Sequence, residues 1–184
     1  MHTKFIEEKI KYTGKELSPH WIYRKFNLQG DAIVAFCGEC EVKLDEMVDV
    51  EDVINNEPIY SKLMLNFIVE NFNIGLVEGV LRQRLLITLI KEVLEEMTSE
   101  PVLRKGDDLF VQGKKLSVSI ATKSLTSVLI HTGININPAG APIEAIGLDF
   151  LKISDIKQFA QKIMLKYSKE IDDIILASTK VSGR

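Results

Sequence analysis

The sequence has few cysteines, no block of basic residues and no long apolar run, and each absence excludes a class of protein. Two cysteines among 184 residues are too few for the disulfide framework of a small secreted domain. The net charge is −3 without any Lys/Arg cluster, so we expect no nucleic-acid partner held by bulk electrostatics. No stretch approaches the roughly 18 uninterrupted apolar residues that a membrane span needs, so we expect no membrane partner.

The composition is that of an ordinary globular protein. Hydrophobic residues make up 46% of the chain and charged residues 27%, and no repeat or Pro/Gly/Ser-rich linker divides it. The first residues are charged and contain no apolar signal region. The sequence therefore predicts one domain over residues 1–184, in the cytoplasm.

The two cysteines, Cys37 and Cys40, have a spacing that suits half a zinc site or a redox pair. A tetrahedral zinc site needs two further ligands, and the three histidines are too scattered to supply a matching pair. This shortage favours two ordinary, partly buried thiols beside a turn, and we predict no metal site.

Periodicity and turn signals predict a mixture of helices and strands. A stripe of apolar residues at helical spacing makes residues 76–97 the strongest helix, and a Gly-containing turn at 112–114 joins two strands. We expect strands over residues 4–12, 32–36, 63–72, 102–104, 108–111, 115–121 and 125–132, and helices over 19–26, 76–97, 154–167 and 168–177. Residues 39–57 and 133–147 are expected to be irregular. The pattern predicts an α+β fold with a mixed, mostly antiparallel sheet flanked by helices.

The hairpin that holds Lys115 carries the most informative chemistry. If this hairpin faces a concave sheet, the Lys115 ammonium can reach a carboxylate or phosphoryl oxygen and stabilise charge during acyl adenylation. Asp107 and Asp108, at the start of the preceding strand, have the oxygens that Mg²⁺ prefers. The alternative is a solvated hairpin tip and an ordinary acidic strand entry.

These segments resemble the core of biotin protein ligases. That family carries Lys-Trp-Pro-Asn-Asp-Leu, then a Gly-Lys-Lys-Leu/Ile-Ala-Gly hairpin, then a strand ending in Gly-Ile-Asn. Arg104 falls at the first lysine, Asp107 and Asp108 at the Asn-Asp pair, and Gly133-Ile-Asn135 at the last motif. Lipoate ligases share the hairpin in a form close to the segment from Lys115 to Ser119.

The chain is more narrowly similar to domain-of-unknown-function family 366, placed with the class II aminoacyl-tRNA synthetase and biotin synthetase fold. That likeness rests on the segments around Trp21, Gly38, Met47, Arg82 and His131. The resemblance implies a biotin/lipoate ligase-like domain, ATP and Mg²⁺ as cofactors, a small-molecule ligand and a homodimer. It implies Lys115 as the catalytic residue and a set of ligand-binding residues: Arg104, Asp107, Asp108, Ser117, His131, Gly133, Asn135 and Gly38.

One loop departs from the family pattern. Biotin ligases have a Gly- and Arg-rich loop after the first core strand, whereas this chain has Glu39, Glu41, Asp45, Glu46 and Asp49 there. Net negative charge beside a triphosphate has the wrong sign unless a metal intervenes. The segment suits a metal, a cationic ligand or a solvated surface loop.

Three functions remain open from the sequence. The first is an adenylating ligase or acyltransferase acting on a small carboxylic acid, and the second is a non-catalytic small-ligand-binding protein on the same fold. The third is a structural homodimer, because a fold does not determine function.

Four single residues have a functional and a structural interpretation. Arg82 or Arg84 can enter the pocket, but helix-surface charges are the more common role. Trp21 is expected in the core. His131 can titrate in a cleft, although a lone His on an apolar strand is more often satisfied in the core.

Overall fold

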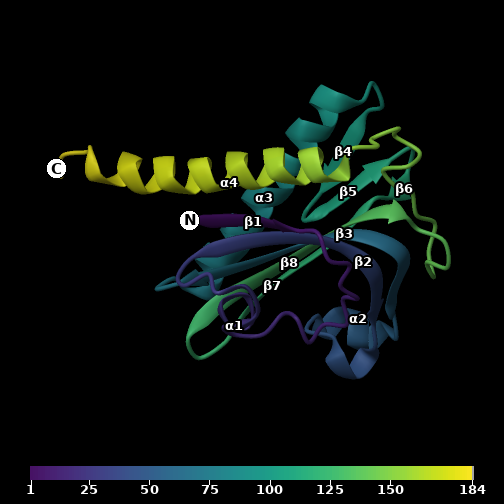
Figure 1. Ribbon diagram of the computed structural model, residues 1–184, viewed down its shortest axis with the longest axis horizontal. Coiled ribbons are helices and arrows are strands. Elements are labelled where there is room, and N and C mark those ends of the chain that lie inside the picture. The colour runs from purple at the N-terminus through teal and green to yellow at the C-terminus, as the bar shows by residue number, and fades with distance from the viewer. Residues whose placement is uncertain (184) are drawn as a thin grey trace.

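A five-stranded sheet forms the centre of the computed structural model, which describes residues 1–183 (Figure 1). The strand order is β1-β2-β3-β8-β7; β1 and β2 are parallel and the other neighbours are antiparallel. The strands are β1 (His2–Ile6), β2 (Ala32–Val42), β3 (Ile59–Phe72), β7 (Ser117–Lys123) and β8 (Ser127–Asn137). The sheet is therefore mixed and mostly antiparallel.

Two long helices cover one face of this sheet (Figure 1). They are α3 (Leu76–Met97) and α4 (Ile156–Thr179). Leu65, Phe67 and Ile130 of the sheet pack against them in the larger hydrophobic cluster. Burial of this apolar surface is the main favourable contribution to the fold.

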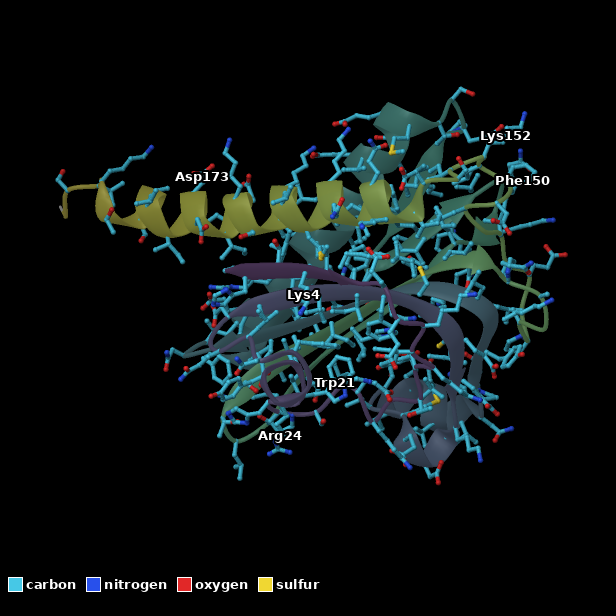
Figure 2. All side chains as sticks on the ribbon, viewed as in Figure 1. Lys4, Trp21, Arg24, Phe150, Lys152 and Asp173 are labelled. Carbon is cyan, nitrogen blue, oxygen red and sulfur yellow. The ribbon has the colours of Figure 1, made fainter. Side chains whose placement is uncertain are left out.

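The opposite face is covered by the N-terminal segment and by short helices. Here α1 (Trp21–Phe26) packs over Val34, Phe36 and Ile68 in a second cluster, and α2 (Val50–Asn55) follows the short 3₁₀ helix η1 (Leu44–Glu46). Figure 2 shows Trp21 directed towards the sheet, while Arg24 on the same helix points away from it. This face is covered incompletely and leaves room for a cavity.

A second, three-stranded sheet packs beside the first. It consists of β4 (Val102–Lys105), β5 (Asp108–Val111) and β6 (Lys114–Lys115), in that order. The turn between β5 and β6 uses Gln112 and Gly113 at φ values of 51° and 77°. Two successive residues at positive φ are typical of a tight hairpin turn, and this turn sets the direction of Lys115.

The predicted fold class, α+β with a mixed, mostly antiparallel sheet flanked by helices, is confirmed. The helix at 76–97 and the strand at 108–111 have the predicted bounds. The expected apolar stripe of this helix included Leu76 and Leu81, but both are exposed. Gly79, Gln83 and Leu86 are buried instead.

Several predicted boundaries were wrong. The two expected C-terminal helices are one helix, α4, capped by Asp155, which accepts from the N–H of Gln158. β8 continues to Asn137 because strands pair with it on both sides, so residues 133–137 are not a loop. β1 ends at Ile6, β2 continues to Val42, and the acidic segment contains η1 and α2.

The two cysteines lie on opposite faces of the sheet. Cys37 packs against the cluster under the long helices, and Cys40 belongs to the cluster on the other face. Both thiols are free, and burial raises the pKa of both, that of Cys40 to about 12. They cannot bind one metal ion together. Both lie on β2, whereas the sequence placed them beside a turn.

Within residues 1–183, no helix has the length and apolar character to cross a membrane. The cytoplasmic location, the homodimer and the absence of a nucleic-acid partner stay predictions.

Candidate functional site

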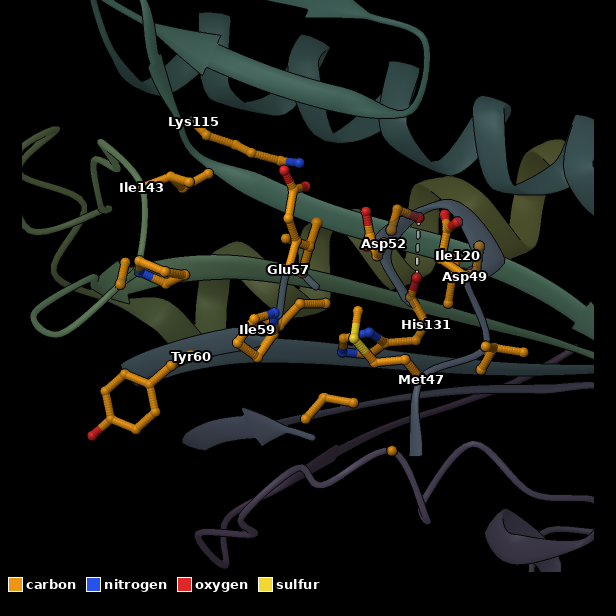
Figure 3. A pocket seen from close by; sticks show the side chains of 18 of the residues that line it. Met47, Asp49, Asp52, Glu57, Ile59, Tyr60, Lys115, Ile120, His131 and Ile143 are labelled. Atoms are coloured by element: carbon orange, nitrogen blue, oxygen red, sulfur yellow. Dashed lines mark hydrogen bonds between the residues drawn. The ribbon is translucent and has the colours of Figure 1, made fainter. Parts of the chain in front are cut away.

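A cavity of about 540 Å³ lies on the face of the central sheet that the long helices leave open (Figure 3). Its floor is formed by Met64, Val118, Ile120 and His131. The small sheet contributes one wall, and η1 with the residues through α2 to Tyr60 contributes the other. The remaining lining residues are Tyr12, Gly14, Val42, Glu46, Met47, Val48, Asp49, Glu51, Asp52, Asn56, Glu57, Pro58, Ile59, Tyr60, Asp107, Asp108, Lys115, Ser119, Asn135, Ala141, Pro142, Ile143 and Ala145. This volume suits a small organic ligand.

Lys115 extends from β6 into the cavity (Figure 3). Backbone hydrogen bonds hold the residue from the 141–147 segment: its N–H donates to the carbonyl of Glu144, and its carbonyl accepts from Ile146. Nζ lies 2.9 Å from Oδ2 of Asp108, and the Lys115 side chain is 26% exposed. The ammonium is therefore fixed in direction, partly shielded from water and still open to a ligand.

The two neighbouring aspartates have different surroundings. Burial raises the pKa of Asp108, and the Lys115 ammonium opposes that rise. Asp107 accepts from Nε2 of Gln83 at 2.9 Å and lies 3.5 Å from Nη2 of Arg84. Both carboxylates face the cavity at the end of the small sheet.

Gln83 connects the helical layer to the cavity wall. Its side chain is buried, and Nε2 donates both to Asp107 and to Oγ of Ser119, at 2.9 and 3.1 Å. The sequence interpretation missed it because Gln83 lies outside the expected apolar stripe of α3. In the sequence, the one local sign of its buried position is its spacing of about one helical turn from both Gly79 and Leu86.

Neither arginine of α3 reaches the cavity lining. Arg82 has only 12% of its side chain exposed and lies 2.6 Å from Glu78 and 3.9 Å from Asp31. Arg84 is half exposed beside Asp107. Arg82 is thus not the surface charge that its helical position suggested.

His131 and Tyr12 form a stacked pair at the cavity floor. Their ring centroids are 3.8 Å apart with an interplanar angle of 14°. The amide of Asn66 donates to the Met64 carbonyl, so its oxygen faces Nε2 of His131 at 3.0 Å and accepts that N–H. Burial lowers the pKa of His131 to about 3, so the imidazole is neutral and Nδ1 carries a lone pair.

The wall around α2 is acidic. Asp49 caps this helix by accepting from the N–H of Glu51, and Asp52 and Glu57 also face the cavity. The pKa of Asp52 is raised, first by burial and then by Asp49, Glu57 and Asp108, while Lys115 lowers it. These carboxylates and the Lys115 ammonium therefore interact electrostatically within the same cavity.

The structure brings five of the predicted site residues to the cavity: Lys115, Asp107, Asp108, His131 and Asn135. Asn135 donates from Nδ2 to the Lys115 carbonyl at 3.4 Å. The other four predicted residues do not line it: Arg104, Ser117, Gly133 and Gly38.

Each of these four has a structural contact instead. Arg104 is exposed and donates to the carbonyl of Gly106, and the buried Ser117 hydroxyl accepts from the N–H of Leu109. A Cβ at Gly133 would lie 2.2 Å from the Met64 sulfur, and one at Gly38 would lie 1.8 Å from the carbonyl oxygen of Ile10. Both glycines therefore allow close packing.

The comparisons with known proteins agree with this architecture. The family model described as a domain of unknown function, DUF366, matches residues 1–182. An uncharacterized protein from Methanocaldococcus jannaschii is 43% identical over 176 residues, which cover 92% of this chain and 79% of the relative. The structure of a protein of unknown function from Pyrococcus horikoshi has a TM-score of 0.94 and 37% identity, covering 100% of this chain and 98% of that one.

More distant structures show the shared fold. A biotin protein ligase from Aquifex aeolicus in complex with biotin and ATP has a TM-score of 0.60 and 19% identity, covering 92% of this chain and 70% of its own. A T. acidophilum protein whose description reads "putative lipoate protein ligase", with bound lipoic acid, has a TM-score of 0.59 and 14% identity, covering 92% of this chain and 86% of its own. The chain therefore has a biotin/lipoate ligase-like fold.

Proposed function

The chain belongs to the DUF366 family, and we propose that this member binds a small carboxylic acid in the Lys115 cavity. The observation that carries the proposal is the Lys115 ammonium, held in a fixed direction inside a cavity of about 540 Å³. An ammonium has three N–H donors. One is directed at Asp108, and the partial exposure of the side chain leaves the others accessible to a ligand carboxylate.

The cavity walls suit the apolar body of such an acid. Met64, Val118 and Ile120 rise from the central sheet, and Met47 and Ile143 face them from the surrounding loops. In small-molecule sites, apolar side chains contact the body of the ligand and polar groups such as Lys115 orient it.

Two proteins with this fold bind small carboxylic acids according to their descriptions. They are the Aquifex biotin ligase, which holds biotin, and the T. acidophilum protein, which holds lipoic acid. These two bound acids support a small carboxylic acid as the ligand class that we propose for this chain.

The lining residues do not fit a magnesium triphosphate. No arginine is found among the cavity-lining residues that the structure describes, and carboxylates outnumber the single lysine. Charge of this sign repels a triphosphate. In residues 1–183 no group of three or more His, Cys, Asp or Glu side chains is arranged to hold a metal ion. We therefore propose binding without adenylation.

An adenylating ligase is the second candidate. It is favoured by Asp107 and Asp108, two carboxylates beside the Lys115 ammonium. A pyrophosphate-release assay with ATP separates the two candidates. Turnover with any carboxylic acid, lost in Lys115→Met, would contradict binding without adenylation.

Calorimetric titration with biotin, lipoate and straight-chain acids from butyrate to decanoate tests the binding proposal. We expect Lys115→Met to weaken binding about ten- to a hundredfold, because a charged hydrogen bond contributes roughly 1.5–3 kcal/mol. Lys114→Met is the matched control, since Lys114 is exposed on the same hairpin and does not line the cavity. Equal losses in both variants, or no binding of any acid, would refute the proposal.

A further inference from the structure

The cavity wall carries more negative than positive charge. Lys115 is the one cation among the lining residues that the structure describes, and seven carboxylates accompany it: Glu46, Asp49, Glu51, Asp52, Glu57, Asp107 and Asp108. Three of the seven lie within 4.0 Å of a cation, in the pairs Lys15–Glu46, Arg84–Asp107 and Lys115–Asp108. Asp49 is engaged as the cap of α2.

The remaining three, Glu51, Asp52 and Glu57, form no ion pair with any group of residues 1–183. Asp52 has only part of its surface in contact with water, and its pKa is raised by burial and by the neighbouring carboxylates. Placing a cation between these groups would stabilise their charged forms. Lys115 lowers the pKa of Asp52, but it is itself paired with Asp108 and so neutralises only part of this negative charge.

His131 gives an independent indication of the ligand. Its side chain is only 3% exposed, lines the cavity and is neutral. Nε2 is bonded to Asn66, whereas Nδ1 has no partner within the part of the chain that the structure describes. Because His131 lines the cavity, this nitrogen can accept a hydrogen bond from a ligand that brings an N–H donor.

We infer that the ligand carries a protonated amine in addition to its carboxylate, and so binds as a zwitterion. The carboxylate half of this inference rests on the proposed function. Lys115 holds the carboxylate, and the ammonium lies on the side of Asp52, Glu57 and Nδ1 of His131. The apolar residues of the floor contact the segment that joins the two charged ends. A cavity with both signs of charge would then discriminate against simple fatty acids.

Three probes with the same carbon chain test the inference by calorimetric titration: hexanoate, ε-aminocaproate and hexylamine. We expect ε-aminocaproate to bind about three- to tenfold more tightly than hexanoate at low ionic strength, the contribution of one partly exposed charge pair. The ratio of the two affinities should decrease with added salt, because salt screens charges on partly exposed carboxylates.

The variant Asp52→Asn should remove most of this preference while leaving the affinity for hexanoate unchanged or higher. Asp45→Asn is the matched control, because Asp45 is an exposed aspartate on η1 that does not line the cavity. Thermal unfolding of each variant shows that it folds. Glu57→Gln gives a second test of the same acidic wall.

The outcomes separate this inference from the proposed function. Hexanoate binding as tightly as ε-aminocaproate overturns the inference and leaves the proposed function intact. Binding of hexylamine without binding of either acid overturns the proposed function and the zwitterion together. Stabilisation of the protein by Mg²⁺, Ca²⁺ or Zn²⁺ alone, lost in Asp52→Asn, assigns the acidic wall to a metal and overturns the inference.

Discussion

Lowering the pH is expected to destabilise the protein through His131. Burial holds the pKa of its imidazole at about 3, compared with an ordinary value of 6.5. Because the pKa is lower in the folded state than in the unfolded state, the stabilising contribution is fully present above 6.5 and is lost as the pH falls towards 3. At about pH 5 the unfolded chain has bound the proton and the folded protein has not. This difference lowers the free energy of unfolding by about 2 kcal/mol, and the loss approaches about 5 kcal/mol as the pH falls below the folded pKa.

Urea unfolding at about pH 8 and about pH 5 measures this effect. His131→Gln cannot titrate, so its free energy of unfolding should change about 2 kcal/mol less between the two pH values than that of the wild type. His2→Gln is the control, because His2 is exposed on β1 and should keep the wild-type dependence. An equal change in the wild type and in His131→Gln would refute the reasoning.

A second measurement needs no substitution. The ring-proton resonance of His131 reports directly on its protonation in the folded protein. We expect its chemical shift to stay constant between about pH 8 and about pH 5, because the folded imidazole remains neutral there. A titration midpoint inside this window would contradict the burial of a neutral ring between Tyr12 and Asn66.

Two further predictions concern the strand that ends beside the cavity. Gly38→Ala should lower the free energy of unfolding by about 3 kcal/mol in urea, because its Cβ would overlap a backbone carbonyl. Gly75→Ala, which has no atom within 4 Å of the added Cβ, should cost about 1 kcal/mol or less. Cys40, fully buried with its pKa raised to about 12, should react with a thiol reagent only after unfolding, and the partly buried Cys37 more slowly than a free thiol. Rapid native reaction of both thiols would show that the strand is wrongly placed.

The sequence predicted those helices and strands for which local sequence and tertiary packing favour the same structure. The helix at 76–97 combines a long run of good helix formers with turn signals at both ends, and the 108–111 strand is bounded by the Asp107 turn and by Gly113. The C-terminal helix was wrongly divided because Ser168 has the character of a helix cap. In the structure its hydroxyl donates to the Met1 carbonyl, a contact from the other end of the chain.

The candidate site could be predicted only where its residues share one hairpin. Lys115, Asp107 and Asp108 are close in sequence, so their motif also predicts that they are close in space. Tyr12 lines the cavity because it forms a bridge with Cys40, and Gln83 contacts Asp107 and Ser119 of the cavity wall because α3 packs across β7. Neither contact leaves a local pattern, since both depend on how separate elements pack.

The hydrogen bonds of Gln83 have a consequence for how ligand preference can change. This side chain belongs to the layer of long helices, yet its amide fixes Asp107 and Ser119 at the edge of the cavity. Substitutions in the interior of α3 can therefore shift these two groups without contacting a bound molecule. A laboratory selection for altered specificity should therefore recover substitutions at Gln83 as well as substitutions in the cavity lining.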